Sequence, residues 1–240
     1  MDIQKTEKCC KTRILWSLLV SRLMLFLFFQ SAIAMLLNSW ESSQKYWLLA
    51  ASLTNIVSIF LLISLFKRED TRFLYLFRFN RVSFRKDLLI FIGLTVILVP
   101  VAFLPNNFLS VWLWGNAEIP FKMMFQPIET WILYILLLAF PVTITLAELA
   151  TYFGYLMPRL EKQLKIKWVS ILLPMLFLSL QHCTLPFIPD VKFIIYRGLV
   201  FFPFALFLGV SIRYRPTLFP YFAILHGVMD LGTVMMLFTV

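Results

Sequence analysis

Long apolar stretches separated by short polar segments dominate the chain. They run over residues 14–38, 46–66, 88–104, 129–157, 168–188, 191–212 and 218–240. Most approach the ~20 residues that an α-helix needs to cross ~30 Å of hydrocarbon. Apolar residues cover every face of these stretches instead of alternating, which argues against transmembrane strands. The pattern therefore predicts an all-α polytopic transmembrane bundle of about seven spans, in a range of six to eight.

Two of these stretches and one of the segments between them depart from this simple pattern. The fourth is long and contains Pro141, which predicts a kink or a division into two pieces. The third is short and is followed by residues 106–127, which we expect to form an outward-facing segment with tryptophans at the membrane interface. Residues 67–87 are basic and aromatic, and this composition predicts an interfacial helix.

The composition excludes most other classes of protein. Hydrophobic residues make up 61% of the chain and charged residues 14%, whereas a soluble domain has about 45–50% and about 25%. A soluble enzyme, a disordered chain and a disulfide scaffold are thereby excluded. The three cysteines are Cys9, Cys10 and Cys183. We expect free thiols, with palmitoylation of the Cys9–Cys10 pair as the alternative.

The distribution of Lys and Arg predicts the orientation. The net charge is +10. If the N-terminus is cytoplasmic, the inner segments carry Lys5, Lys8, Lys11, Arg13, Lys67, Arg68, Arg72, Arg78, Arg81, Arg85, Lys86, Arg159, Lys162, Lys165, Lys167, Arg213 and Arg215. The outer segments carry only Lys45, Lys122 and Lys192. This excess predicts a cytoplasmic N-terminus and, with seven spans, an external Val240.

Because the positive charge is explained by topology, we predict no nucleic-acid partner. The first stretch resembles a signal peptide, since basic residues precede it and Ala32-Ile33-Ala34 resembles a cleavage site. Its apolar run is longer than a typical signal core, so we predict an uncleaved anchor.

Four ionisable residues lie deep inside apolar stretches. They are the acids Glu148 and Asp230 and the two histidines of the chain, His182 and His226. At about 1.5 Å per helical residue, each lies about 16 to 22 Å from the cytoplasmic end of its stretch. We therefore expect a cluster near the middle of the bilayer, with His226 and Asp230 on one helix face. For Arg22 and Arg197 we expect ordinary pairing or snorkelling outside this cluster.

Such a cluster allows several kinds of chemistry. Glu148 is a candidate general base toward water, and the histidines are candidates to orient that water or to stabilise an oxyanion. Alternatively, His182, His226 and Glu148 are candidate ligands of a zinc ion with an open position. Interhelical hydrogen bonding without catalysis is a further interpretation. A proton or ion relay is another, although the two similar halves typical of transporters are missing from the sequence.

Three short motifs follow one another over residues 129–240. The first includes Glu148, Gly154-Tyr155-Leu156 and Pro158-Arg159-Leu160, the second ends at His182, and the third is His226-Gly227-Val228-Met229-Asp230. In this order they resemble the CPBP family of CAAX proteases and bacteriocin-processing (ABI-like) enzymes. The resemblance implies a CAAX-protease-like catalytic core over residues 129–240. Residues 1–128 would then form N-terminal transmembrane helices with a basic cytoplasmic loop.

The resemblance also implies a function. It implies an intramembrane endopeptidase in which Glu148 activates water, His182 and His226 bind that water or the oxyanion, and Asp230 orients His226. It implies membrane lipids as surroundings, a prenylated or other membrane-associated peptide as substrate, and a bacterial cell membrane as location. It leaves metal-free and zinc-dependent mechanisms open; we favour the metal-free one, without a cofactor. It implies nothing about oligomeric state.

The sequence departs from the first family motif at two positions, and Leu178 stands where the second motif has Phe, a change that we expect to affect only packing. Leu149 stands where the family has a second Glu, and Phe153 where it has Arg. If that Glu and Arg form an ion pair in the family, losing both leaves no orphan charge. The alternative is a catalytically inactive scaffold or a bacteriocin-immunity or regulatory membrane protein.

Overall fold

The protein is a bundle of helices, as the hydrophobic pattern predicts. A computed structural model describes residues 3–240, with side chains from Thr12 onward, and this part contains no strand. The first helices are α1 (Ile3–Leu37), α2 (Trp40–Gln44), α3 (Trp47–Lys67), the 3₁₀ turn η1 (Phe73–Phe77), α4 (Phe84–Trp114) and α5 (Ile119–Met124). They are followed by α6 (Thr130–Leu149), the π-helix η2 (Ala150–Leu156), α7 (Met157–Gln163), α8 (Lys167–Gln181), the 3₁₀ turn η3 (His182–Thr184), α9 (Val191–Val200), α10 (Phe202–Tyr214), the 3₁₀ turn η4 (Pro216–Leu218) and α11 (Phe219–Met236).

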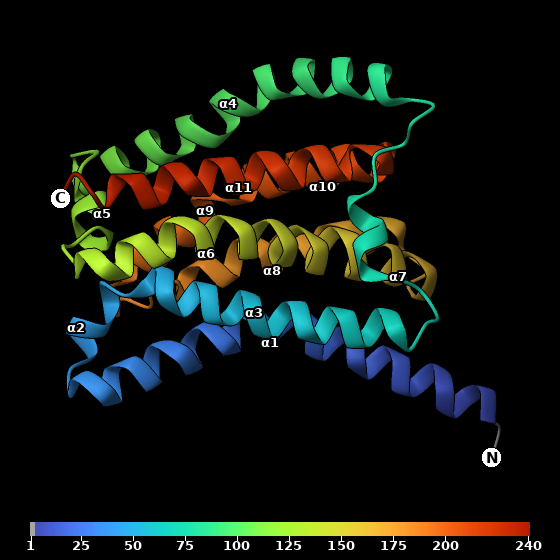
Figure 1. Cartoon of the computed structure of the whole chain (residues 1–240), viewed down its shortest axis with the longest axis horizontal. Coiled ribbons are helices and arrows are strands. Elements are labelled where there is room, and N and C mark those ends of the chain that lie inside the picture. The colour runs from blue at the N-terminus through green and yellow to red at the C-terminus, as the bar shows by residue number, and fades with distance from the viewer. Residues whose placement is uncertain (1–2) are drawn as a thin grey trace.

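Six helical segments of the described chain are long and apolar enough to cross a membrane. They are Thr12–Leu37, Trp47–Lys67, Phe84–Trp114, Thr130–Gln163, Val191–Tyr214 and Pro216–Met236. These segments indicate an integral membrane protein and confirm the polytopic helical bundle. The predicted fifth span corresponds to α8, which has only 15 residues. The two termini nevertheless lie at opposite ends of the bundle (Figure 1), as an odd number of passages through it requires.

Two segments differ from the prediction. Helix α4 continues through Pro100 and Pro105 and ends at Trp114, where Gly115 adopts φ +73°. A continuing helix satisfies backbone polar groups that a loop at this depth would leave unpaired. The basic segment after α3 contains only the short turn η1 instead of an interfacial helix. Packing of Phe73 on Phe66, with ring centroids 5.9 Å apart, holds this turn against the bundle.

The irregularity of the fourth span lies beyond Pro141. Helix α6 runs through Pro141 without ending, and the hydroxyls of Thr143 and Thr145 donate to the carbonyls of Ala139 and Pro141, at 2.7 Å in both cases. The hydrogen-bond pattern changes only after Leu149, where the π-helix η2 begins. Single π-turns inside helices occur frequently at functional sites. The change of pattern therefore begins at Ala150, two residues after Glu148.

Two apolar clusters fill the bundle, one toward each end. The first contains Leu19, Leu62, Leu149, Leu178 and Phe222 among others. The second contains Phe26, Ala51, Ile144, Leu185 and Val234 among others. Polar residues separate the two clusters along five of the helical passages, and these residues are Arg22, Asn55, Ser58, Glu148, Gln181, His182, His226 and Asp230. The middle of the bundle is therefore a polar layer between two apolar ones.

Candidate functional site

Glu148 lies at the centre of the polar layer. Its side chain is buried, with 2% exposed, near the end of α6. Carboxylate oxygen Oε2 accepts a hydrogen bond from Gln181 Nε2 at 2.8 Å and lies 3.5 Å from Arg22 Nη2. Helix α8 supplies Gln181 and helix α1 supplies Arg22. One oxygen of the carboxylate is therefore fixed from two neighbouring helices.

Arg22 belongs to the site, and the expectation that it lies outside the cluster was wrong. Its side chain has 0% exposure. Nε donates to Gln181 Oε1 at 2.8 Å, Nη1 to Ser58 Oγ at 3.2 Å, and Nη2 to Asn55 Oδ1 at 2.8 Å. Because its partners surround it inside the bundle, the guanidinium has no need to snorkel to the membrane surface.

Additional hydrogen bonds hold the partners of Arg22. Asn55 Nδ2 donates to Thr143 Oγ1 at 3.3 Å, which joins α3 to α6. The Tyr152 hydroxyl donates to Gln181 Oε1 at 3.3 Å, which joins η2 to α8. This network connects α1, α3, α6, η2 and α8. The sequence offered two signals for it: Asn55 and Ser58 are polar residues three apart in an apolar stretch, and Gln181 directly precedes His182.

The other side of Glu148 faces helix α11. His226 Nε2 lies 3.0 Å from Glu148 Oε1 and 3.5 Å from Asp230 Oδ2. Both approaches are within ion-pair distance but lack hydrogen-bond geometry. All three atoms are buried, and none of them has a hydrogen-bond partner. The predicted proximity of Glu148, His226 and Asp230 is therefore present in the structure. The buried polar atoms on this side remain available to a ligand, a water molecule or a substrate.

A close contact between two helices brings His226 to Glu148. Gly227, the residue after His226, packs on α6 beside Thr145 and Pro141. A Cβ at this position would overlap Thr145 Oγ1 and would come within 3.0 Å of the Pro141 carbonyl oxygen. Only glycine permits this approach of α11 to α6 without displacement. The imidazole of His226 also lies beside Phe204 of α10, with ring centroids 6.0 Å apart.

His182 lies in the same layer, but its contacts point elsewhere. Its Nδ1 is 2.8 Å from the Leu178 carbonyl oxygen, and its ring stacks on Phe201 with centroids 3.8 Å apart. A carbonyl only accepts hydrogen bonds, so Nδ1 carries the proton and Nε2 is the remaining nitrogen. Arg197 donates from Nε to the His182 carbonyl at 3.2 Å. Arg197 is thus held by backbone carbonyls, including that of His182, and forms the ordinary pairing that was expected.

The ligands predicted for zinc do not form a metal site. No group of three His, Cys, Asp or Glu side chains in the part of the chain with described side chains is arranged to hold a metal ion. Tetrahedral coordination by His182, His226 and Glu148 would require these side chains to rearrange.

The two departures from the first motif, and Leu178 in the second, are buried in the first apolar cluster. Leu149 has 0% and Phe153 2% exposure, and both pack among aliphatic and aromatic side chains. Cys183 has a free thiol that lies 3.5 Å from the Ile194 carbonyl oxygen. The side chains of Cys9 and Cys10 lie outside the described residues.

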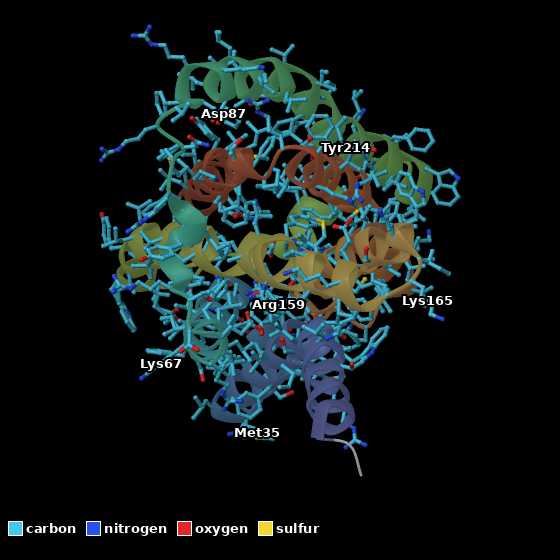
Figure 2. All side chains as sticks on the ribbon, turned by 90° about the vertical axis from the view of Figure 1, so that its right-hand side faces the viewer. Met35, Lys67, Asp87, Arg159, Lys165 and Tyr214 are labelled. Carbon is cyan, nitrogen blue, oxygen red and sulfur yellow. The ribbon has the colours of Figure 1, made fainter. Side chains whose placement is uncertain are left out.

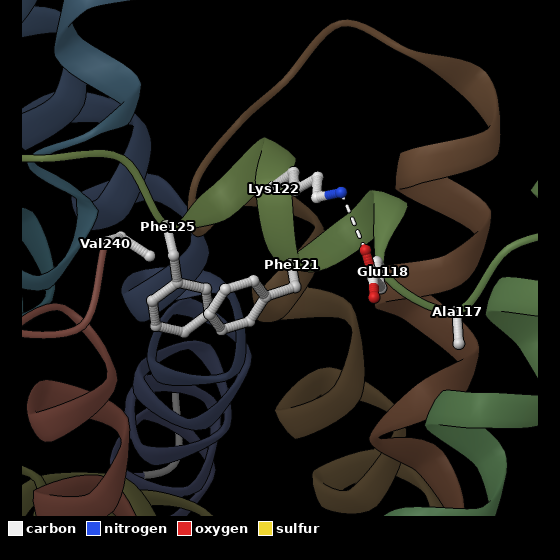
Figure 3. A pocket seen from close by; sticks show the side chains of 6 residues that line it. All are labelled: Ala117, Glu118, Phe121, Lys122, Phe125 and Val240. Carbon is white, nitrogen blue, oxygen red and sulfur yellow. Dashed lines mark hydrogen bonds and ion pairs between the residues drawn. The ribbon is translucent and has the colours of Figure 1, made fainter.

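A separate cleft lies at the end of the bundle that holds α5 and the C-terminus (Figures 1 and 3). Its lining residues are Ala117, Glu118, Phe121, Lys122, Phe125 and Val240. The rings of Phe121 and Phe125 stack with centroids 4.5 Å apart, and Lys122 Nζ lies 2.8 Å from Glu118 Oε2. The cleft contains none of the predicted site residues. The exposed Glu118–Lys122 pair provides a comparison for the buried Glu148–Arg22 pair.

Comparisons with models of protein families, with curated proteins and with solved structures found no match for this chain. The resemblance to the CPBP family therefore stays a prediction that rests on the three motifs.

Proposed function

We propose that the protein is an intramembrane endopeptidase in which Glu148 activates a water molecule without a metal ion. One observation carries the proposal. Oε2 of Glu148 is held by Gln181 and approached by Arg22, while Oε1 is buried, has no hydrogen bond and faces His226. A general base needs a fixed position and a free lone pair within reach of water. The order of the three motifs supports the peptide bond as the bond that is cleaved.

In this mechanism Oε1 of Glu148 accepts a proton from the water molecule that attacks the carbonyl carbon. His226 Nε2, 3.0 Å from Oε1, stabilises the oxyanion or passes the proton to the leaving amine. Asp230 orients His226 from the next turn of α11. The ring of His182, which the Leu178 carbonyl and Phe201 hold in place, is the second candidate for the oxyanion, to which its Nε2 donates in the doubly protonated form. A membrane-associated or prenylated peptide is the substrate class that the resemblance supports.

Cleavage of membrane-anchored peptides tests this proposal. The purified protein is incubated in proteoliposomes with a library of such peptides, prenylated and unmodified, and products are identified by mass spectrometry. Glu148→Gln keeps the size of the side chain but removes the base, and we expect it to cleave at least 100-fold more slowly. Glu118→Gln changes an exposed carboxylate and serves as the control. Equal cleavage by the wild type and Glu148→Gln would show that the products have another origin.

A non-catalytic scaffold is the second candidate. It is favoured by the complete pairing of Arg22, whose hydrogen bonds join helices in the manner of interhelical polar contacts in membranes. Replacement of two motif residues by the buried Leu149 and Phe153 also fits a protein that has lost catalysis. Cells that depend on the protein distinguish the two candidates. Full function of Glu148→Gln in such cells supports the scaffold, and loss of function of a folded variant supports the enzyme.

We further propose that the N-terminus faces the cytoplasm of a bacterial cell. The end of the bundle that carries residues 67–86, Arg159 and Lys165 holds most of the Lys and Arg residues, and the other end carries Lys45, Lys122 and Lys192. This asymmetry supports the orientation. A reporter that is active only outside the cytoplasm, fused after Val240, should be active. Activity of the same reporter at the N-terminus would reverse the assignment.

A further inference from the structure

We propose that residues 67–86, the basic segment, bind anionic phospholipid head groups, with a lipid phosphate held between Arg72 and Arg78 at the ring of Tyr75. The segment connects α3 to α4 at the end of the bundle shown in Figure 2, between the labelled Lys67 and Asp87. The proposal is independent of catalysis, because the segment contains none of the residues around Glu148.

Ion pairs among the residues with described side chains leave the cations of the basic segment without an acidic partner. Its cations are all exposed, and they are Lys67, Arg68, Arg72, Arg78, Arg81, Arg85 and Lys86. Within the described chain, none of them forms an ion pair.

Three acids in or beside the segment are engaged by cations of other segments, whereas Asp70 forms no ion pair with a described side chain. Glu69 pairs with Arg159, Glu161 with Arg213 at 2.6 Å, and Asp87 with Arg215 at 2.5 Å. These pairs use cations that lie outside the basic segment. The segment therefore presents a concentrated positive charge that requires anions from elsewhere.

Tyr75 brings two of these cations to one place. The guanidinium carbon of Arg78 lies 4.0 Å from the ring centroid, and that of Arg72 lies 5.9 Å from it. Two guanidinium groups at one ring repel each other unless an anion lies near both. Arginine is suited to phosphate because its planar fork makes paired hydrogen bonds to two oxygens. Two such forks near one ring, among five further cations, favour a head-group phosphate as the ligand.

The apolar residues of the segment indicate a lipid surface and not an acidic protein. Phe73 is buried and anchors the segment, whereas Leu74 is 65% and Val82 99% exposed. Helix α4, a candidate membrane span, begins at Phe84, two residues after Val82. A segment at this position lies at the level of the head groups, where Arg contacts phosphate and apolar side chains enter the acyl region.

The opposite end of the bundle provides a matched contrast. There Lys45 lies 5.0 Å from the ring centroid of Tyr46, but the Tyr46 hydroxyl donates to Glu129, so an acid is close to the cation. Lys122 pairs with Glu118. The double variant Lys45→Gln/Lys122→Gln therefore removes the same amount of charge as Arg72→Gln/Arg78→Gln, but from cations that already have acidic neighbours.

Lipid binding to the purified full chain tests the proposal. Each variant is mixed in detergent with equal amounts of phosphatidylglycerol and phosphatidylcholine, and the bound lipids are counted by native mass spectrometry. One cation near a membrane surface is worth about a fivefold change in binding. We therefore expect Arg72→Gln/Arg78→Gln to lower the phosphatidylglycerol preference about tenfold or more, and the lysine control to change it less than about twofold.

Two further measurements keep the proposal open to refutation if the arginine variant folds poorly. Tyr75→Leu removes the ring and should lower the preference severalfold while every cation remains. Raising the salt concentration from about 0.05 to about 0.5 M should also lower the preference of the wild type. An unchanged preference in Arg72→Gln/Arg78→Gln, or an equal loss in the lysine control, would overturn the proposal. Loss of binding to an acidic protein with unchanged lipid preference would assign the segment to protein docking.

Discussion

The two sides of the Glu148 carboxylate differ in how completely their polar groups are paired. Toward α1, α3 and α8, Oε2 of Glu148 meets Arg22 and Gln181, and each of these side chains has further partners. Toward α11, Oε1 of Glu148, Nε2 of His226 and Oδ2 of Asp230 lie close together without a hydrogen bond. Oε2 of Glu148 therefore belongs to a hydrogen-bonded network that stabilises the bundle, whereas Oε1 remains available to a ligand, a water molecule or a substrate.

Arg22 should therefore be the most important of these side chains for stability. Arg22→Leu leaves the buried Glu148 without its cation and removes hydrogen bonds to Asn55, Ser58 and Gln181. We expect the free energy of unfolding to fall by about 3–5 kcal/mol, as for other broken buried ion pairs. Denaturation in mixed detergent micelles measures this change.

The double variant Arg22→Leu/Glu148→Leu sharpens this test, because it removes both charges and should recover part of the lost stability. Lys122→Leu breaks an exposed ion pair and is the control, for which we expect no measurable change. A wild-type unfolding free energy for Arg22→Leu would refute the structural role of the paired side.

The contact between α6 and α11 should have the next largest effect. Gly227→Ala places a methyl group against Thr145 Oγ1 and the Pro141 carbonyl. We expect a loss of about 1–3 kcal/mol in unfolding free energy, together with a displacement of His226 that lowers activity. Gly232→Ala on the same helix meets nothing within 4 Å and should be neutral or slightly stabilising. Equal unfolding free energies for the two alanine variants would contradict the described helix contact.

The unpaired side should respond in the opposite way. His226→Gln and Asp230→Asn remove groups whose facing atoms have no hydrogen bonds. We expect the unfolding free energy to change by less than about 1 kcal/mol or to rise. Peptide cleavage, in contrast, should fall about 10²-fold or more, because general acid–base groups contribute at least that much. A large loss of stability with normal cleavage would reverse the assignment of the two sides.

An exposed carboxylate at the end of the bundle should show the smallest effect. The Tyr46 hydroxyl donates to Glu129 at 2.8 and 2.7 Å. Burial, and next the hydrogen bond to Glu129, raise the pKa of Tyr46 to about 12, and the bond from Tyr46 lowers the pKa of Glu129. The stabilisation by Glu129 is therefore lost as the pH falls below about 4.3, its unfolded pKa. That by Tyr46 is lost as the pH rises from about 10 to about 12.

Because Glu129 is exposed to solvent, we expect the contribution of this pair to be a few tenths of a kcal/mol. Tyr46→Phe should reduce the loss of unfolding free energy both at acidic pH and at alkaline pH. Tyr134→Phe changes an exposed tyrosine and should leave both losses unchanged. If Tyr46→Phe lost as much unfolding free energy as the wild type at acidic and at alkaline pH, the pH dependence would belong to other groups.

The sequence predicted the helical bundle and the meeting of Glu148, His226 and Asp230, because the cost of charge in hydrocarbon makes these residues conspicuous. It did not predict that Arg22 joins them. The position of a residue along its helix sets the depth of its backbone, but the long side chain of Arg22 reaches from α1 into the polar layer between other helices. Gln181 and Asn55 were missed because uncharged amides are less conspicuous than ions in an apolar stretch.

The helix ends were harder to predict than the helices. The sequence predicted a third stretch ending at residue 104, but α4 continues through Pro105 to Trp114, because the surrounding apolar medium favours a continuous helix. Pro141 indicated a break, but the change of pattern occurs in η2, beyond Glu148. Both differences arise from packing and surroundings, and local residue preference does not contain that information.

Glu148→Asp tests the role of the Glu148 carboxylate as the base most directly. The shorter side chain keeps the negative charge beside Arg22 but withdraws both oxygens by about 1.5 Å, the length of one carbon–carbon bond, so the base moves away from His226 and the hydrogen bond from Gln181 is weakened. We expect the unfolding free energy to stay within about 1.5 kcal/mol of the wild-type value. Peptide cleavage should fall about 100-fold, as expected when a reacting group is displaced by about 1 Å or more. A folded Glu148→Asp protein that cleaves peptides at the wild-type rate would contradict the account.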